Sequence, residues 1–291
     1  MAIYSRQATT SEEQISILED RGLNFEDRNL AIQNIENVGY FRFKGYCLSF
    51  YEKGKRDVFK QNTTFEKIFD IYRFDERFRI LLFQMIEHIE VVYKSKIGYY
   101  FSLEYGALGH YSSANFNEIN FHSDWMMKLD ESISRASQRK ERFLKNYKEN
   151  YDNTFPIWVS LEITSMGNLS KFYKNLIPEF QNRIAKNICG YRREYLESWL
   201  YSISSIRNIC AHGGRLYDRQ VAITAKIDNK SSEIIDNTKI FSNIFILKNM
   251  CTDEQYWDRF QRNLQALIDI YADSLDLEKM GFPDNWRSLL V

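Results

Sequence analysis

A segment that runs from a threonine cap at Thr63 or Thr64 to about Tyr100 constrains the fold of this chain most. Its apolar residues recur at helical spacing, which predicts one long helix with a buried stripe. That stripe contains Ile68, Tyr72, Phe78, Leu82, Met85, Ile89 and Val92. The 291 residues include only 12 glycines and 3 prolines, which favours long helices and few tight turns. We therefore expect a mainly α fold, a helical bundle with short irregular or β segments.

Capping residues and spacing predict the remaining elements. The Ser11-Glu12-Glu13-Gln14 stretch is typical of a helix start, and that helix is expected to end near Arg21. Further helices are expected to end at Gly39 and to span 124–149, 157–166, 169–176, 179–189, 194–212 and 252–271. The other segments are expected to be less regular: 40–57 as a short hairpin or bent helix, 106–123 as a loop, 220–228 as a strand or extended loop, and 229–238 as a mobile polar segment.

Composition is that of a globular protein, with 44% hydrophobic and 27% charged residues. No apolar run approaches the roughly 18 residues of a membrane span, and residues 1–16 lack the pattern of a signal peptide. The four cysteines are scattered, without a Cys-x-x-Cys pair, which favours reduced thiols in a cytoplasmic protein and no zinc site. His110 and His122 lack partners at metal-ligand spacing and are expected at the surface, and His88 lacks the second histidine of a helical zinc motif. No metal or cofactor is expected.

Charge is balanced overall, with 39 basic and 39 acidic residues, but it is unevenly distributed. Residues 135–148 and 167–193 each contain six bases and one acid, whereas 11–37 contain seven acids and two bases. Residues 252–291 contain eight acids and four bases. The middle of the chain is therefore basic, and such a region can follow a phosphate backbone. The alternative is a solvated helix face without a ligand.

The stretch Arg207-Asn208-Ile209-Cys210-Ala211-His212, followed by Gly213-Gly214, carries the strongest chemical pattern. Arginine can clamp a phosphate with its planar guanidinium, and histidine can transfer a proton near neutral pH. Asparagine can orient the imidazole by a hydrogen bond. These groups can together cleave RNA without a metal. The alternative is structural, because cations are favoured at the C-terminal ends of helices whether or not they catalyse a reaction.

The motif is expected at the end of a helix over 194–212. Trp199, Ile203, Ile206 and Cys210 form its apolar stripe, and the glycines after His212 supply a C-terminal cap. Asn208 and His212 are four residues apart and share a face. Arg207 and His212 are five apart, roughly 140° around an ideal helix. Either the last turn unwinds, or the two groups act with copies from a second chain.

The pattern Arg-Asn-x-Cys-Ala-His resembles the R-x4-6-H motif of HEPN-type ribonucleases. A longer series of motifs in the same order, over about residues 10–290, is similar to the Abi_2 group of bacterial abortive-infection proteins, the AbiD/AbiF-like proteins. We expect relatives often to carry another polar or basic residue where this chain has Gly213-Gly214. The motifs are Val38–Tyr46, Thr63–Glu66, Tyr72–Arg79, Ile86–Val91, Pro156–Val159 with Glu162, Ser165–Ser170, Arg207–Arg219 and Met280–Trp286.

This resemblance implies a metal-independent endoribonuclease toxin of phage defence. It also implies a homodimer and a restraining partner such as a small non-coding RNA. We expect one domain over residues 1–291, with an N-terminal helical part at 1–150 and a HEPN-like core at 157–271. RNA is the expected partner; DNA, which lacks the 2′-hydroxyl, and membranes are not.

The candidate site has three groups of residues. Arg207, Asn208 and His212 are the expected catalytic residues, and Glu162, on an upstream helix, is expected to orient Arg207. The residues expected to bind RNA are Arg139, Lys140, Arg142, Lys171, Arg192, Arg193, Arg215 and Arg219. The competing hypothesis is a non-catalytic RNA-binding or scaffold protein of a defence system. A metal nuclease would need clustered carboxylates, for which Glu87, Glu90 and Asp75 are weak candidates.

Overall fold

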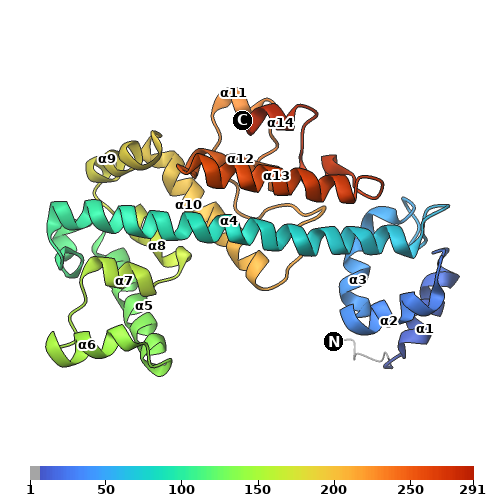
Figure 1. Ribbon diagram of the computed structural model, residues 1–291, viewed down its shortest axis with the longest axis horizontal. Helices are drawn as coiled ribbons and strands as arrows, with labels where there is room; N and C mark the ends of the chain where they lie inside the picture. The colour runs from blue at the N-terminus through green and yellow to red at the C-terminus, as the bar shows by residue number, and fades with distance from the viewer. Residues whose placement is uncertain (1–6) are drawn as a thin grey trace.

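The computed structural model describes residues 7–291. The expectations for residues 1–6, which concern the signal-peptide pattern and the start of the domain, lie outside the described residues. The described residues are mainly helical (Figure 1), which confirms the predicted fold class. Four short 3-10 helices and three isolated β-bridges accompany the α-helices of this range. The α-helices are α1 Ser11–Asp20, α2 Arg28–Val38, α3 Tyr40–Cys47, α4 Phe65–Tyr105, α5 Ile119–Gln138, α6 Arg142–Asn150, α7 Ile157–Ile163, α8 Met166–Lys174, α9 Pro178–Cys189, α10 Arg193–Ala211, α11 Asn229–Ser232, α12 Ile240–Met250, α13 Glu254–Ile270 and α14 Trp286–Leu289.

Helix α4 is the longest described element, with 41 residues, or roughly 60 Å of helix. The Thr64 hydroxyl caps it by accepting a hydrogen bond from the Lys67 backbone N–H. The helix ends at Gly106, whose positive φ of 78° suits a residue without a side chain. Helices α7, α10, α12 and α13 all pack against it. The predicted long helix is therefore confirmed, and it forms the centre of the fold.

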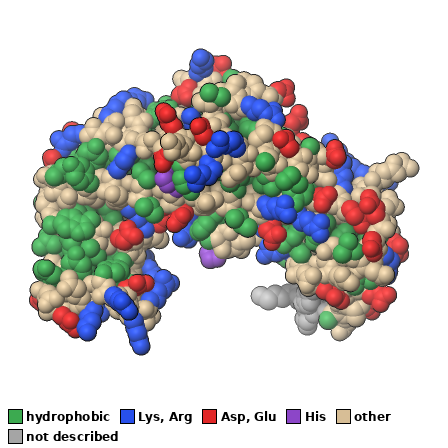
Figure 2. Space-filling view, in the orientation of Figure 1, with side chains coloured by type: hydrophobic (Ala, Val, Ile, Leu, Met, Phe, Trp, Pro, Cys, Tyr) green, Lys and Arg blue, Asp and Glu red, His purple; other side chains and the backbone are tan. Residues whose placement is uncertain are grey.

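The molecule has the shape of an arch. In Figure 1, helix α4 runs along the arch, with α1–α3 at one end and α5–α7 at the other. Helix α10 crosses α4 and ends on the concave side, between these two ends. Figure 2 shows the same side hollowed in the space-filling view. The fold thus places the C-terminal end of α10 within a broad concavity.

One hydrophobic cluster extends through the described chain from Ile15 to Leu290. It includes α12, a helix that the sequence analysis does not predict. Residues of α12 are buried on nearly every side, so its sequence lacks the alternation between apolar and polar faces that marks a surface helix. Among residues 7–291, no helix combines the length and the apolar character needed to cross a bilayer.

Several predicted boundaries differ from the structure. The single helix expected over 124–149 is two helices, because Lys140 adopts a left-handed conformation with φ of 57° between α5 and α6. Helix α5 also begins earlier, at Ile119, within the predicted loop. The cap of α1 is Thr10 rather than Ser11, and Thr10 forms a reciprocal capping pair with Glu13.

Other segments become helical where less regular structure was expected. Residues 40–57 contain α3 and the 3-10 helix η1 (Leu48–Phe50), followed by a bridge between Tyr51 and Phe59. The polar stretch 229–238 begins with the short α11, capped by the Asp228 carboxylate. Residues 220–228 form no strand and no helix. The predicted helix 157–166 ends at Ile163, and Met166 already belongs to α8.

Candidate functional site

Helix α10 carries the Arg207–His212 motif. Its buried face includes Leu196, Trp199, Ile203 and Ile206, which pack into the core and fix the helix against α4, α8 and α9. The stripe predicted from spacing is therefore present, although Cys210 at its end is only partly buried. Burial of one face leaves the opposite face of α10 accessible.

The end of α10 lies at His212, as the glycine pair predicts. The His212 backbone N–H still donates to the Asn208 carbonyl at 3.0 Å, so helical geometry continues to the motif's last residue. Unwinding begins at Gly213, whose φ is 63°. The side chain of Arg42, from α3, donates to the Gly213 carbonyl and fixes this turn. Because the turn stays helical, Arg207 and His212 remain roughly 140° apart around α10.

Arg207 lies against α4. Its Nε is 3.6 Å from Oε2 of Glu90, and its guanidinium carbon lies 5.3 Å from the centre of the Phe83 ring. Glu90 is mostly buried and also pairs with Lys94, at 2.9 Å. These contacts restrict the guanidinium to one side of the helix end. The Arg207 side chain as a whole is 36% exposed, so it remains accessible to a ligand.

Asn208 and His212 project from the exposed side of the helix end. Neither side chain has a hydrogen-bond or ion-pair partner within the described part of the chain. Both residues are exposed, which agrees with the prediction that they share one face of the helix. The motif is thus divided: Arg207 is fixed beside α4, whereas Asn208 and His212 face the solvent.

The expected role of Glu162 is corrected by the structure. Glu162 is exposed near the end of α7, and its backbone carbonyl accepts a hydrogen bond from Lys94 at 3.3 Å. The carboxylate that pairs with Arg207 belongs to Glu90, on α4. The physical reason is that α10 crosses α4 in direct contact, and α4 presents Glu90 toward Arg207 there.

Asp75 holds the loop that follows the motif. This fully buried carboxylate accepts hydrogen bonds from the backbone N–H groups of Leu216 and Tyr217, at 3.1 and 2.9 Å. It also accepts from the Tyr46 hydroxyl at 2.7 Å and from Arg79 at 2.6 Å. Burial raises the pKa of Asp75, and these donors oppose that rise. The loop after His212 is therefore fixed to α4 by a polar network inside the core.

The basic residues expected to bind RNA lie in four places. Arg139, Lys140 and Arg142 are exposed around the α5–α6 junction, at one end of the arch, and Lys171 is exposed on α8. Arg192 and Arg193 begin α10, roughly 27 Å of helix from its end. Only Arg215 and Arg219 follow the motif closely. The structure therefore does not gather these eight residues into one patch.

Arg215 and Arg219 are engaged in local structure. Arg215 donates to the carbonyls of Tyr217 and Asp218, at 3.0 and 3.3 Å, and Arg219 donates to the Arg215 carbonyl at 3.3 Å. These bonds shape the loop after the motif. Both residues are partly exposed, so their guanidinium groups keep some surface on that loop.

Two predicted surface histidines are buried instead. His110 is fully buried, with Nε2 3.2 Å from the Ser160 hydroxyl, and His122 donates to the His110 carbonyl at 2.8 Å. Both fill the space between α5, α7 and the end of α4. Their burial could not be predicted from the sequence, because the segment around them has the composition of a loop. Burial lowers the pKa of His110 to about 4, with a smaller effect from His122. His110 is therefore neutral near pH 7.

His88 stacks on Tyr256, with ring centres 3.9 Å apart. Within residues 7–291, no three His, Cys, Asp or Glu side chains gather in a way that could hold a metal ion. The four cysteines are unpaired thiols. Burial raises the pKa of both Cys47 and Cys210 to about 12, which keeps these two thiols protonated.

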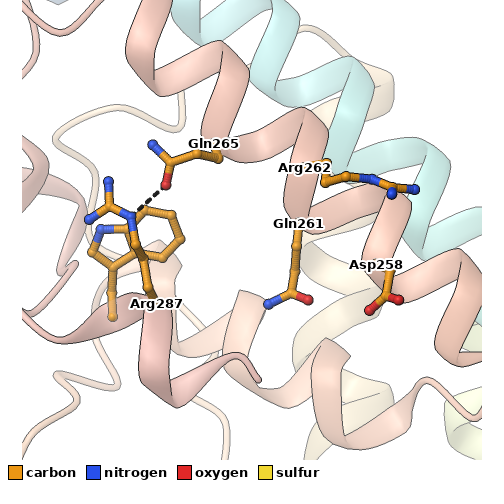
Figure 3. A pocket seen from close by; sticks show the side chains of 6 residues that line it. Asp258, Gln261, Arg262, Gln265 and Arg287 are labelled. Atoms are coloured by element: carbon orange, nitrogen blue, oxygen red, sulfur yellow. Dashed lines mark hydrogen bonds between the residues drawn. The ribbon is translucent and has the colours of Figure 1, made fainter.

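Several cavities lie outside the motif. The first, of about 400 Å³, lies between α13 and α14 and is shown in Figure 3. Several of its polar side chains already form hydrogen bonds: Arg287 donates to Gln265 at 2.6 Å, and Gln261 donates to the Leu290 carbonyl at 2.8 Å. The second, of about 570 Å³, lies between α5, α8 and α10, and therefore adjoins the helix that carries the motif.

Fold and site together define a class: mainly α-helical proteins that present an Arg–Asn–His set at the C-terminal end of a core helix. A family model for Abi-like proteins, Abi_2, matches residues 33–218, more than half of the chain. The chain belongs to this Abi-like family, whose name points to abortive infection, a form of phage defence. Comparison with curated proteins and with solved structures gives no match for this chain.

Proposed function

We propose that this Abi-like protein is a metal-independent endoribonuclease of the HEPN type, acting as a toxin in abortive infection. One observation carries the proposal: the end of α10 leaves Asn208 and His212 exposed, while Glu90 fixes Arg207 on another side of the same helix end. A structural role alone would not require an exposed histidine without partners at the helix end that also carries an oriented arginine. The family match supports the defence setting.

The proposed chemistry uses the RNA's own 2′-hydroxyl. Its oxygen attacks the adjacent phosphorus, the bond from phosphorus to the 5′-oxygen breaks, and a 2′,3′-cyclic phosphate and a 5′-hydroxyl result. One histidine accepts the proton of the 2′-hydroxyl, and a protonated histidine donates one to the leaving 5′-oxygen. Arg207 stabilises the charge that develops on the phosphate oxygens. Asn208, one turn before His212 on the same face, orients the imidazole.

A two-fold dimer would complete such a site. One chain holds Arg207 and His212 on different sides of α10, and one histidine cannot be both acid and base in a single step. Two α10 ends related by a two-fold axis would bring two arginines and two histidines to one phosphate. A two-fold contact of one surface with itself is also the commonest oligomer interface. We therefore propose the homodimer as the active form.

RNA is the proposed partner in two capacities, as the substrate and as a small non-coding RNA that restrains the toxin. A restraining RNA could cover the concave face or hold the protomers apart. The proposal places the protein in the cytoplasm with its substrate. DNA lacks the attacking hydroxyl and should resist cleavage.

The test uses purified protein, total RNA and EDTA. We expect cleavage in the presence of EDTA, with 2′,3′-cyclic phosphate ends on the products. His212→Ala and Arg207→Ala should each abolish cleavage, at a cost in stability of about 1 kcal/mol or less. His88→Gln, which changes the histidine stacked on Tyr256, is the matched control and should cleave normally.

Two results would contradict the proposal. Strict dependence on added Mg²⁺ or Mn²⁺ would exclude the metal-independent mechanism. RNA binding without cleavage by the unaltered protein, retained in His212→Ala, would instead establish a non-catalytic RNA-binding protein.

A further inference from the structure

The cavity between α5, α8 and α10 has the size of a ligand site. Its volume of about 570 Å³ falls within the range of pockets that bind small molecules. The exposed side chains of Phe121 and Tyr201 line it, together with the buried Trp125, whose Nε1 donates to the Asn168 carbonyl at 3.1 Å. Phe121 is 57% exposed and Tyr201 is 56% exposed, so both rings offer unused apolar surface at the opening. Flat rings of this kind stack on nucleobases.

The charges around the cavity are of both signs. Lys171 and Lys226 line it and form no ion pair among the described residues, whereas Lys174 pairs with Glu197 at 3.7 Å. Asp124 also lines the cavity and has no cationic partner in that range. Unpaired lysines attract a phosphate, and an unpaired carboxylate accepts hydrogen bonds from an amino group. A nucleotide whose base carries an exocyclic amino group offers a phosphate to the lysines and an N–H donor to the Asp124 carboxylate.

The cavity and the motif lie along one face of α10. Tyr201 and Asn208 are seven residues apart, and Tyr201 and His212 eleven apart, which places Asn208 and His212 each within about 20° of Tyr201 around an ideal helix. All three are exposed, and Ser205, between them, is partly exposed. The eleven residues correspond to roughly 16 Å along the axis. That distance is spanned by a few nucleotides of an extended single strand.

We propose that this cavity is a base-binding subsite for single-stranded RNA. It holds one unpaired base, stacked on Tyr201 and Phe121, a few nucleotides from the phosphate that meets His212. Adenine, cytosine and guanine carry an exocyclic amino group and are favoured over uracil, which has none. The position of the subsite relative to the cut rests on the proposed nuclease function, whereas binding of the base does not.

The test measures binding of short, fluorescently labelled oligo(A) and oligo(U) in a His212→Ala background, so that cleavage does not interfere. Tyr201→Ala should weaken oligo(A) binding about tenfold, as expected for one lost stacking contact, and should affect oligo(U) less. Tyr201→Phe keeps the ring and should bind oligo(A) normally. Tyr99→Ala, which removes a similarly exposed tyrosine from α4 outside the cavity, is the matched control.

Equal oligo(A) binding by the Tyr201→Ala and Tyr99→Ala proteins would overturn the subsite. So would AMP binding as tightly as oligo(A), because it would assign the cavity to a free nucleotide. A different result would contradict the nuclease proposal alone. In that case the protein without the His212→Ala change would not cleave RNA, and RNA binding would still depend on Tyr201.

Discussion

At the scale of single residues, the two charged members of the motif have different surroundings. Arg207 is fixed by Glu90 and Phe83, whereas His212 has no side-chain partner among the described residues. This difference suits their proposed roles, because a phosphate clamp gains from a fixed orientation and a proton carrier must reach the substrate. It also identifies Glu90 as a positioning residue for Arg207.

Glu90→Gln should lower cleavage about tenfold, which corresponds to roughly 1.4 kcal/mol of transition-state stabilisation. The amide keeps the size of the side chain but removes the charge that holds Arg207. The loss should appear in kcat more than in KM, since Arg207 acts on charge that develops during the reaction. Glu162→Gln is the control and should cleave normally. Equal losses in the two variants would contradict the assignment of Glu90.

The sequence predicts the motif but not its supporting residues. Spacing alone places Arg207, Asn208 and His212 at a helix end, because glycines and the apolar stripe are local features. Glu90 and Asp75 come from α4, and their contacts with the α10 region depend on how two distant helices pack. Both residues lie in segments that resemble motifs of Abi-like proteins. That resemblance singles out the two segments, but it does not show that their carboxylates contact the α10 region.

At the scale of elements, polar groups inside the core fix the connections between helices. Asp75 ties the loop after α10 to α4, and His110 ties the end of α4 to Ser160 of α7. Local patterns gave α4 and α10 correctly because each has a clear apolar face. They failed for α12, which is buried on nearly every side, and for the α5–α6 break, where the backbones of Lys140 and Glu141 leave the helical conformation.

Asp75→Asn should destabilise the protein by about 3 kcal/mol, because it leaves the buried Arg79 without a negative partner. Urea unfolding measures the change. Asp70→Asn is the matched control on the same helix: Asp70 pairs with Arg73 at 3.9 Å at the surface, where an ion pair contributes about 1 kcal/mol or less. Similar losses in the two variants would contradict a special role for Asp75.

His110 should make stability depend on pH. Its pKa is about 4 in the folded protein and 6.5 in the unfolded chain, so only the unfolded chain gains a proton between these values. Stability is therefore full above about pH 6.5 and falls as the pH drops toward 4, by roughly 3 kcal/mol from this group. Denaturant unfolding across this range should show a shallower slope in His110→Gln than in the unaltered protein.

At the scale of the whole molecule, the arch separates the motif from an exposed basic segment. The end formed by α5 and α6 carries Arg139, Lys140 and Arg142, all exposed. Charge counts predicted this basic segment from the sequence. They did not predict its distance from the motif, because the arch separates residues that a compact bundle would have gathered.

Charge reversal of Arg139, Lys140 and Arg142 to glutamate should weaken RNA binding and reduce its salt slope by roughly 2, as expected for three lost phosphate contacts on a single strand. Reversal of Lys53, Lys55 and Arg56, which are equally exposed in a loop of the other end, is the control. An unchanged slope in the first variant would mean that the α5–α6 junction is a solvated surface without RNA.

Mixing unaltered and inactive chains tests the composite site. Unaltered protein mixed with an excess of His212→Ala chains should lose most of its activity, because a mixed dimer holds one histidine and the proposed reaction needs two. Light scattering on the same samples should show a dimer. A monomer that cleaves at full rate would refute the shared site.

The single long helix also limits how proteins of this family can change in length. Each residue added inside a helix rotates everything beyond it by about 100° and shifts it by about 1.5 Å. One insertion in α4 would therefore turn one end of the arch away from the other and expose the buried stripe. The connecting loops can be lengthened without this constraint. The length of α4, which sets the distance between the two ends of the arch, can change only in steps of about seven residues, because two full turns restore the original face.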